Sequence, residues 1–119
     1  MSGYRIDRIA EDIKREIVAQ IRELKDPRVK NKFLTVVRVD VSSDASYAKV
    51  YVSDLMGIKS AEEAVRGLES ATGRIRREVG QRLHLRKTPE LKFIADDSVE
   101  KGFEMFKKLE KADGNSKDD

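Results

Sequence analysis

The chain has 119 residues, of which 39% are apolar and 39% charged, with a formal net charge of +3, so we expect one domain with a single core. Because the sequence contains no cysteine, it excludes disulfides, a thiol nucleophile and thiolate metal sites. No apolar run approaches the roughly 20 residues that span a bilayer, and the first residues lack the apolar core of a signal peptide, so we expect a cytosolic protein with no membrane partner.

The first segment predicts a long amphipathic helix. Its apolar residues recur every three or four positions and so form one stripe of a helix. They are Ile6, Ile9, Ile13, Ile17, Ile21 and Leu24. Asp26-Pro27 ends the pattern because the residue before a proline is pushed out of the helical region. Among the basic residues on the other faces, Arg5 and Arg8 are candidates for phosphate contact, and a solvated helix face explains most of the rest.

Two segments with a period of two predict an antiparallel hairpin. In the first, residues 34–41, alternation places Thr35, Val37, Val39 and Val41 on the side that packs on the helices. In the second, residues 47–53, alanine and valine alternate with tyrosine and lysine. The opposite face of the sheet would carry Arg38, Tyr47, Lys49 and Tyr51. Bases can stack on such tyrosines, or the tyrosines pack across the sheet.

A second helical region follows the hairpin and contains a break. Ser60 and Glu63 have the spacing of a capping box, which predicts that a helix starts there. Gly73 weakens this helix, because a glycine in a helix costs about 1 kcal/mol relative to alanine. We therefore predict two helical pieces that meet at a kink formed by Ala71, Thr72 and Gly73, where an anion can bind to the backbone amides that start the second piece.

Positive charge is concentrated beside this kink. Residues 74–92 contain seven basic and two acidic residues, a local net charge of +5, and they include a basic loop before the last strand. Such a concentration indicates contact with a polyanion, most often nucleic acid, whereas the simpler interpretation is a solvated helix face. The predicted RNA-binding residues are Arg74, Arg76, Arg77, Arg82, Arg86, Lys87, Lys49, Arg5 and Arg8.

A third strand, at residues 91–95, and a short final helix complete the predicted domain. Asp97 and Glu100 have capping-box spacing, and the helix that they start would cover the open end of the sheet with apolar side chains. These are Phe103, Phe106 and Leu109. We divide the chain into a domain at residues 1–110 and a disordered charged tail at residues 111–119, because no apolar residue follows Ala112.

The order helix, strand, strand, helix, helix, strand resembles that of a type II KH domain. The implied fold class is α+β, with a three-stranded sheet, helices on one face and a short C-terminal helix. Four segments in this order are similar to ribosome-binding factor A of bacteria, and the similarity covers residues 4–108. The segments are residues 39–53, the break at Ala71-Thr72-Gly73, residues 85–93, and Asp96-Asp97-Ser98 followed by Gly102.

This resemblance implies a non-enzymatic assembly factor that binds the free small (30S) ribosomal subunit and its 16S rRNA. The family assists late maturation of that subunit, supports processing of the 5′ end of the rRNA precursor, and matters for growth in the cold. It replaces the Gly-x-x-Gly loop of ordinary KH domains with an Ala-x-Gly break, which residues 71–73 match. Because this sequence has no Gly-x-x-Gly, we expect contact with the shape and phosphates of folded rRNA, by a monomer without a cofactor.

Two other classes of function stay open. The carboxylate pairs Glu62-Glu63 and Asp96-Asp97 could hold Mg²⁺ in a nuclease, although capping of predicted helix starts explains them more simply. The lone His84 lies between two leucines and has no partner in the sequence that would make it a catalytic base. The second alternative is a protein-interaction module that recruits another assembly factor, for instance a GTPase. We expect neither catalysis nor a bound metal.

Overall fold

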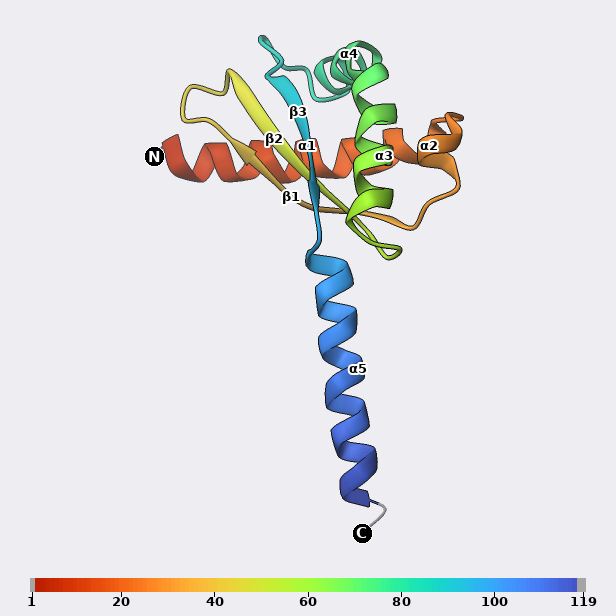
Figure 1. Ribbon diagram of the computed structural model, residues 1–119. Helices are drawn as coiled ribbons and strands as arrows, with labels where there is room; N and C mark the ends of the chain where they lie inside the picture. The colour runs from red at the N-terminus through yellow and green to blue at the C-terminus, as the bar shows by residue number, and fades with distance from the viewer. Residues whose placement is uncertain (1, 118–119) are drawn as a thin grey trace.

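The computed structural model describes residues 2–117 and has the predicted α+β fold (Figure 1). Its sheet has the order β1-β2-β3, and helices cover one face of it. β1 (Leu34–Val41) and β2 (Tyr47–Asp54) pair antiparallel, as predicted, whereas β3 (Glu90–Asp96) pairs parallel to β2. Parallel neighbours need a long crossover connection, which the two helices between β2 and β3 provide.

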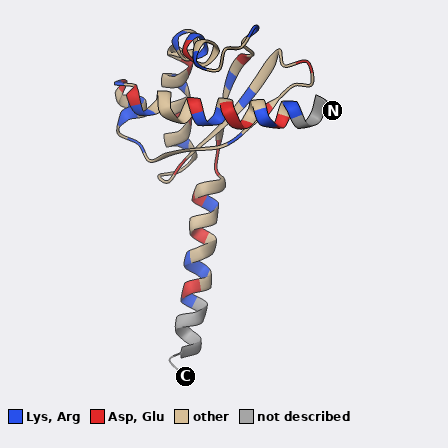
Figure 2. Cartoon of the chain, turned by 180° about the vertical axis from the view of Figure 1, so that it is seen from behind, with Lys and Arg blue, Asp and Glu red and all other residues tan. Residues whose placement is uncertain are grey.

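The first helix, α1 (Ser2–Glu23), packs its apolar stripe on the sheet. Ile13 and Ile17 are fully buried because their spacing places them on one side of the helix. They belong to one hydrophobic cluster together with strand residues such as Val50 and Phe93. On its outer side, basic and acidic residues alternate along the helix (Figure 2).

A short helix that the sequence analysis does not predict, α2 (Pro27–Lys30), follows α1. Asp26 caps it, because its carboxylate accepts hydrogen bonds from the backbone amide of Arg28 at 2.9 Å and from Nη2 of the same residue at 2.7 Å. These hydrogen bonds lower the pKa of Asp26. Proline has no amide hydrogen, but an amide in the first turn of a helix has no partner within the helix, so nothing is lost there. The proline that ends α1 therefore also starts α2.

The predicted faces of β1 are wrong in its first half. The register between β1 and β2 shifts between Val36 and Arg38, which marks a β-bulge at Val37. Val36 and Val39 are therefore both buried, and Thr35 is exposed. Strict alternation places Thr35 on the buried side. Because side chains alternate with a period of two, the one extra residue in the bulge moves the residues before it to the opposite face.

The helix α3 (Ile58–Ser70) starts before the predicted capping box. Its N-cap is Gly57, with a φ of 114°, a conformation that favours glycine. Ser60 lies in the first turn and does not cap the helix. Ser60 and Glu63 instead bind the ammonium group of Lys32, with N···O distances of 3.0 and 3.3 Å. The capping-box prediction is therefore wrong, and the two residues make a tertiary contact.

The break between α3 and the next helix, α4 (Thr72–Arg82), lies at Ala71. Ala71 is both the C-cap of α3 and the N-cap of α4, with φ −99° and ψ 6°. Its carbonyl accepts the amide hydrogen of Ile75 at 2.9 Å, so the second helix starts at once. Gly73 lies inside α4 and is exposed, and no neighbouring backbone approaches it.

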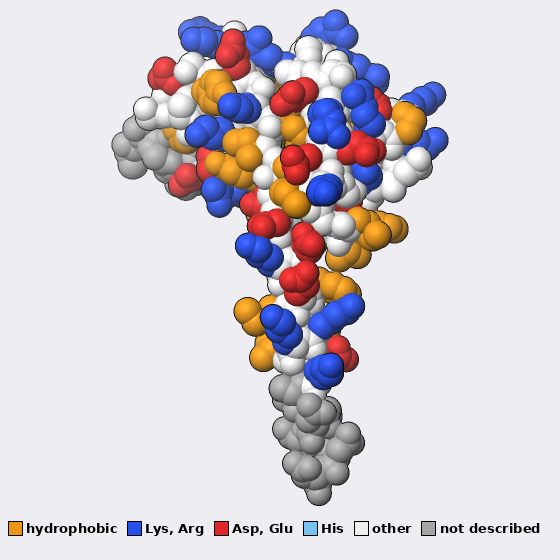
Figure 3. Space-filling view, in the orientation of Figure 1, with side chains coloured by type: hydrophobic (Ala, Val, Ile, Leu, Met, Phe, Trp, Pro, Cys, Tyr) orange, Lys and Arg blue, Asp and Glu red, His pale blue; other side chains and the backbone are white. Residues whose placement is uncertain are grey.

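The last helix, α5 (Ser98–Lys117), projects away from the domain (Figure 1). It has 20 residues and is longer than predicted. Its large apolar side chains at residues 103–109 are exposed instead of covering the open end of the sheet (Figure 3). They include Phe103, Phe106 and Leu109. Residues 111–117, which the sequence analysis assigns to a disordered tail, continue this helix, and residues 118–119 lie outside the described residues. The helix is held at its start, where the Val99 amide donates to Oγ of Ser53 at 3.2 Å.

Gly67 of α3 and Gly73 of α4 should respond to alanine in opposite ways. A Cβ atom at Gly67 would lie 2.8 Å from Cγ2 of the buried Val29, so α2 must move. At Gly73 nothing lies within 4 Å of such an atom. We expect Gly67→Ala to lower the free energy of unfolding by about 1 kcal/mol, and Gly73→Ala to raise it by about 0.5–1 kcal/mol. Urea denaturation measures both values, and shifts of equal sign would contradict this packing.

Candidate nucleic-acid interface

A hollow of about 440 Å³ lies between α4 and the loop that precedes β3, and it is open to solvent. Its lining residues are Gly73, Arg76, Arg77, Arg86, Lys87 and Thr88. Four of the six are cations and none is acidic, so the hollow has a strongly positive rim. It brings together four of the predicted contact residues and the glycine of the predicted kink.

Arg76 connects α4 to the loop on the other side of this hollow. Its Nη2 donates to the carbonyl oxygen of Thr88 at 2.7 Å, and its Nε donates to that of Pro89 at 3.1 Å. Thr88 lies so close to Gly80 of α4 that a side chain at Gly80 would displace it. The guanidinium group therefore ties the loop to α4 through two carbonyl groups. Arg76, which the sequence predicts as an RNA contact, positions the loop.

Among the other predicted residues on α4, Arg82 is engaged by acidic residues. Its Nε lies 3.1 Å from a carboxylate oxygen of Glu16 in α1 and 3.6 Å from one of Glu78. This pairing holds α4 against α1 and leaves Arg82 with little unbalanced charge. Arg74 is exposed on α4 but does not line the hollow. Three predicted residues, on α1 and β2, are also outside the lining of the hollow: Arg5, Arg8 and Lys49.

The open face of the sheet carries the aromatic and basic side chains that the sequence places there. The guanidinium carbon of Arg38 lies 4.2 Å from the centroid of the Tyr51 ring, and its Nε lies 3.1 Å from a carboxylate oxygen of Asp40. Hydrogen bonding to Tyr51 and then to Asp40 raises the pKa of Arg38. Tyr47 and Lys49 line a smaller hollow of about 250 Å³. Because Arg38 covers one tyrosine and is balanced by Asp40, this face is the weaker candidate for RNA.

A second group of cations, not among the predicted RNA-binding residues, lies at residues 22–32. Five basic and two acidic residues occur there, at the end of α1 and around α2. The charge count that identified residues 74–92 would also have found this group. Two of these residues, Arg22 and Lys25, belong to the basic residues of the first segment that a solvated helix face explains.

Both carboxylate pairs considered for a nuclease include a residue that takes part in a structural contact. Glu63 binds Lys32, and Asp96 accepts a hydrogen bond from the Ser98 amide at 2.7 Å. Within the described part of the chain, no group of three or more His, Cys, Asp or Glu residues is arranged to hold a metal ion. The helices in that part also include none that is long and apolar enough to cross a membrane.

Arg76→Met should release the loop from α4. A hydrogen bond to a charged group contributes about 1.5–3 kcal/mol, so we expect hydrogen exchange of nearby loop amides to accelerate about tenfold or more. The reporters are the amides of Leu85 and Glu90, which donate to the carbonyl groups of Gly80 and Ser46. Arg77→Met removes the same charge from an exposed position and serves as the control. Identical exchange in the two variants would contradict the positioning role.

Comparison with known proteins places the chain in a family. The family model described as Ribosome-binding factor A matches residues 5–109. The chain is 47% identical to the ribosome-binding factor A of Clostridium tetani over 120 residues, which cover 100% of this chain and 98% of that protein. Its fold is similar to the crystal structure of ribosome-binding factor A from Thermus thermophilus, with a TM-score of 0.67, 31% identity and coverage of 76% of this chain and 93% of that one.

A further match is to a relative in a complex. A homology model of the Thermus thermophilus ribosome-binding factor A was fitted into a cryo-electron microscopy map of its complex with 30S. It has a TM-score of 0.57 and 34% identity to this chain, and the match covers 70% of this chain and 86% of that one. The family model and the full-length similarity agree with the resemblance found in the sequence: the chain belongs to the ribosome-binding factor A family.

Proposed function

We propose that this protein is a non-enzymatic assembly factor that binds the free 30S subunit through its 16S rRNA. The cation-lined hollow between α4 and the loop before β3 carries the proposal. The relative that was fitted into a map of a 30S complex supports it. Cations that neutralise RNA phosphates release bound counterions, which drives association. The rRNA backbone is the polyanion that such a partner offers.

The hollow suits the phosphates of folded RNA better than a single base. It is open, and none of its lining residues is aromatic. Arg77, Arg86 and Lys87 are exposed at its rim, and a guanidinium group can bind two phosphate oxygens at once. Because Arg76 fixes the loop, the backbone that carries the Arg86 and Lys87 side chains is already held in place before RNA binds. Binding then costs less conformational entropy than it would with a free loop.

This mode of binding fits a role in late maturation of the small subunit. We place the protein in the cytoplasm as a monomer that supports processing of the 5′ end of the rRNA precursor. The requirement should be greatest in the cold, where wrongly paired RNA rearranges slowly. We assign no catalytic step to it. Cleavage of precursor rRNA by the purified protein with Mg²⁺, abolished by changing a carboxylate pair, would overturn that assignment.

A second candidate function is recruitment of another assembly factor. The exposed large apolar side chains of the described residues gather around the β2–α3 turn and along α5 (Figure 3). They are Phe33, Leu55, Met56, Ile58, Phe103, Met105, Phe106 and Leu109. Clusters of this kind mark protein-binding surfaces. Since α4 and α5 lie at opposite ends of the molecule (Figure 1), one molecule can bind RNA at one end and a protein at the other.

Charge reversal at the hollow should abolish subunit binding. In the double variant Arg77→Glu, Arg86→Glu, two attractive charges become repulsive, and we expect no co-sedimentation with small subunits. The neutral variant Arg77→Gln, Arg86→Gln should bind more weakly. Its plot of log affinity against log salt should be less steep by about 1.4–1.8, because each lost phosphate contact removes roughly 0.7–0.9 from the slope.

The control for this experiment is Lys59→Glu, Lys108→Glu, which changes the net charge equally at exposed positions on α3 and α5. Circular dichroism should show that both variants are folded. We expect the control to co-sediment normally. Retained binding in the first variant would remove the RNA contact from the hollow, and equal loss in both would show that net charge, not the site, determines binding.

The apolar surface of α5 can be tested separately. Phe103 and Phe106 have 46% and 61% of their surface exposed, so Phe103→Ser, Phe106→Ser should leave the fold and the subunit binding unchanged. If α5 recruits a protein, the wild-type chain should retain that protein in a pull-down after RNA digestion, and this variant should lose it. Recovery of the same proteins by both chains would argue against recruitment through α5.

A further inference from the structure

A recess with an apolar floor lies where the end of α1, α2 and the start of β1 meet. Its volume is about 300 Å³. The floor is formed by Ile21, Leu24, Val29 and Leu34, and the rim by Arg22, Lys30 and Lys32. None of these residues lines the hollow beside α4. Basic residues are visible on α2 and on the segment that joins it to β1 (Figure 2).

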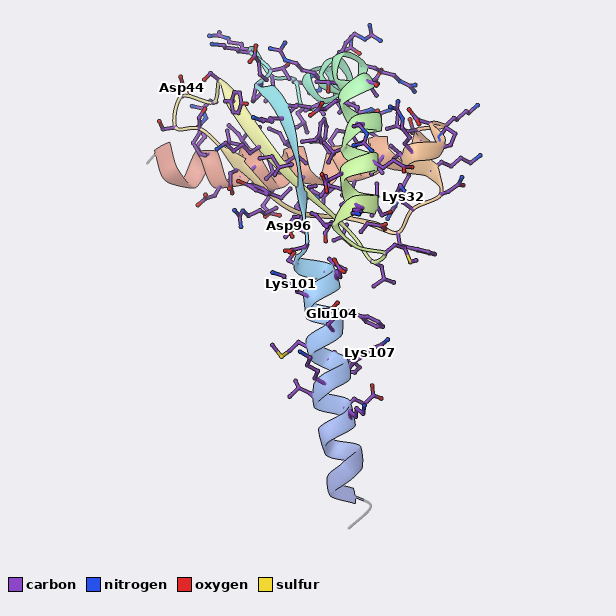
Figure 4. The ribbon with its side chains drawn as sticks, viewed as in Figure 1. Lys32, Asp44, Asp96, Lys101, Glu104 and Lys107 are labelled. Carbon is purple, nitrogen blue, oxygen red and sulfur yellow. The ribbon has the colours of Figure 1, made fainter. Side chains whose placement is uncertain are left out.

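The rim combines fixed and adaptable cations. Lys32 lies beside α3 (Figure 4), where Ser60 and Glu63 hold its ammonium group and only 14% of its side chain is exposed. Arg22 and Lys30 are exposed. In the part of the chain that the structure describes, neither of them forms an ion pair. These two cations are therefore available to an anionic ligand.

The packing of α2 fixes the shape of this recess. Val29 is 2% exposed and lies against Gly67 of α3, where any larger residue would push it away. Lys30, the next residue, is consequently presented at the surface beside the apolar floor. Arg22, in the last turn of α1, lines the same recess. The two adaptable cations thus share one recess with the apolar residues of its floor.

An apolar floor between cations matches an unpaired nucleotide. A base can lie on the aliphatic side chains while its phosphates meet Arg22 and Lys30, since proteins recognise RNA sequence mostly in unstacked, single-stranded segments. The recess is at the small end of the range of ligand pockets, which is about 300–1,000 Å³, and it suits one nucleotide. Charge complementarity to phosphate favours RNA over an apolar peptide, and an acidic peptide is the competing ligand.

We propose that this recess binds an unpaired nucleotide of the small-subunit rRNA. The inference rests on the RNA binding proposed above and adds a contact of a different kind. The hollow beside α4 neutralises backbone phosphates, whereas the recess holds a base together with its phosphate. Two such contacts on one domain would recognise a folded RNA surface from which a nucleotide is splayed out.

Methyl NMR tests the proposal directly. A chain with ¹³C-labelled methyl groups on Ile, Leu and Val is titrated with a single-stranded uridine RNA of about eight nucleotides. We expect the methyl signals of Ile21, Val29 and Leu34 to shift. In the variant Arg22→Gln, Lys30→Gln these shifts should be lost, and the slope of log affinity against log salt should be less steep by about 1.4, since two single-strand phosphate contacts are removed. Unchanged methyl spectra without RNA show that the variant is folded.

The variant Arg77→Gln, Arg86→Gln is the matched control, and it should keep the methyl shifts of the recess. If RNA moves only the amide signals around the hollow, the recess proposal fails and the proposed function stands. If no signal moves and small subunits do not co-sediment, both fail. Equal methyl shifts with an abasic RNA backbone of the same length would exclude a base contact. Methyl shifts with a glutamate-rich peptide but not with RNA would make the recess a protein-binding site.

Discussion

The parallel pairing of β3 with β2 is the constraint on which the candidate interface depends. Parallel strands need a crossover connection, and α3 and α4 supply it. The chain must then return to the start of β3, which brings the basic loop at residues 85–89 beside α4. Arg76 fastens it there through the carbonyl groups of Thr88 and Pro89. The hollow is thus a consequence of strand topology and of one guanidinium group, and its cations come from α4 and from the loop that leads into β3.

Much of the fold could be predicted because local periodicity and core packing agree. The apolar stripe of α1 and the alternation of β2 correspond to buried faces. The failures occur where a tertiary contact overrides a local pattern. An extra residue at Val37 exchanges the faces of β1, and the Ser60 and Glu63 pair binds Lys32 instead of capping a helix. Neither a bulge nor a partner 28 positions away leaves a signal in the local sequence.

The candidate site was predictable in its position and less so in the roles of its residues. The charge count predicts a cluster at residues 74–92, and four of its seven cations line one hollow. It could not distinguish Arg76, which binds carbonyl groups of its own loop, from Arg77, which is exposed at the rim. Both are arginines one position apart, and only the direction of the loop decides between a structural role and the proposed contact with RNA.

We infer that the distribution of charge, and not its total, would make the proposed RNA binding selective. Residues 74–92 carry a net +5, whereas residues 96–119 carry a net −3. A uniformly basic domain would bind any RNA through counterion release. In the proposed mode of binding, RNA is attracted to the hollow beside α4, where four of the six lining residues are cations and none is acidic, and encounters are oriented before contact. With few unbalanced cations, affinity in this mode would depend on how many phosphates fit the hollow at once, and the shape of the RNA surface would thereby become part of the recognition.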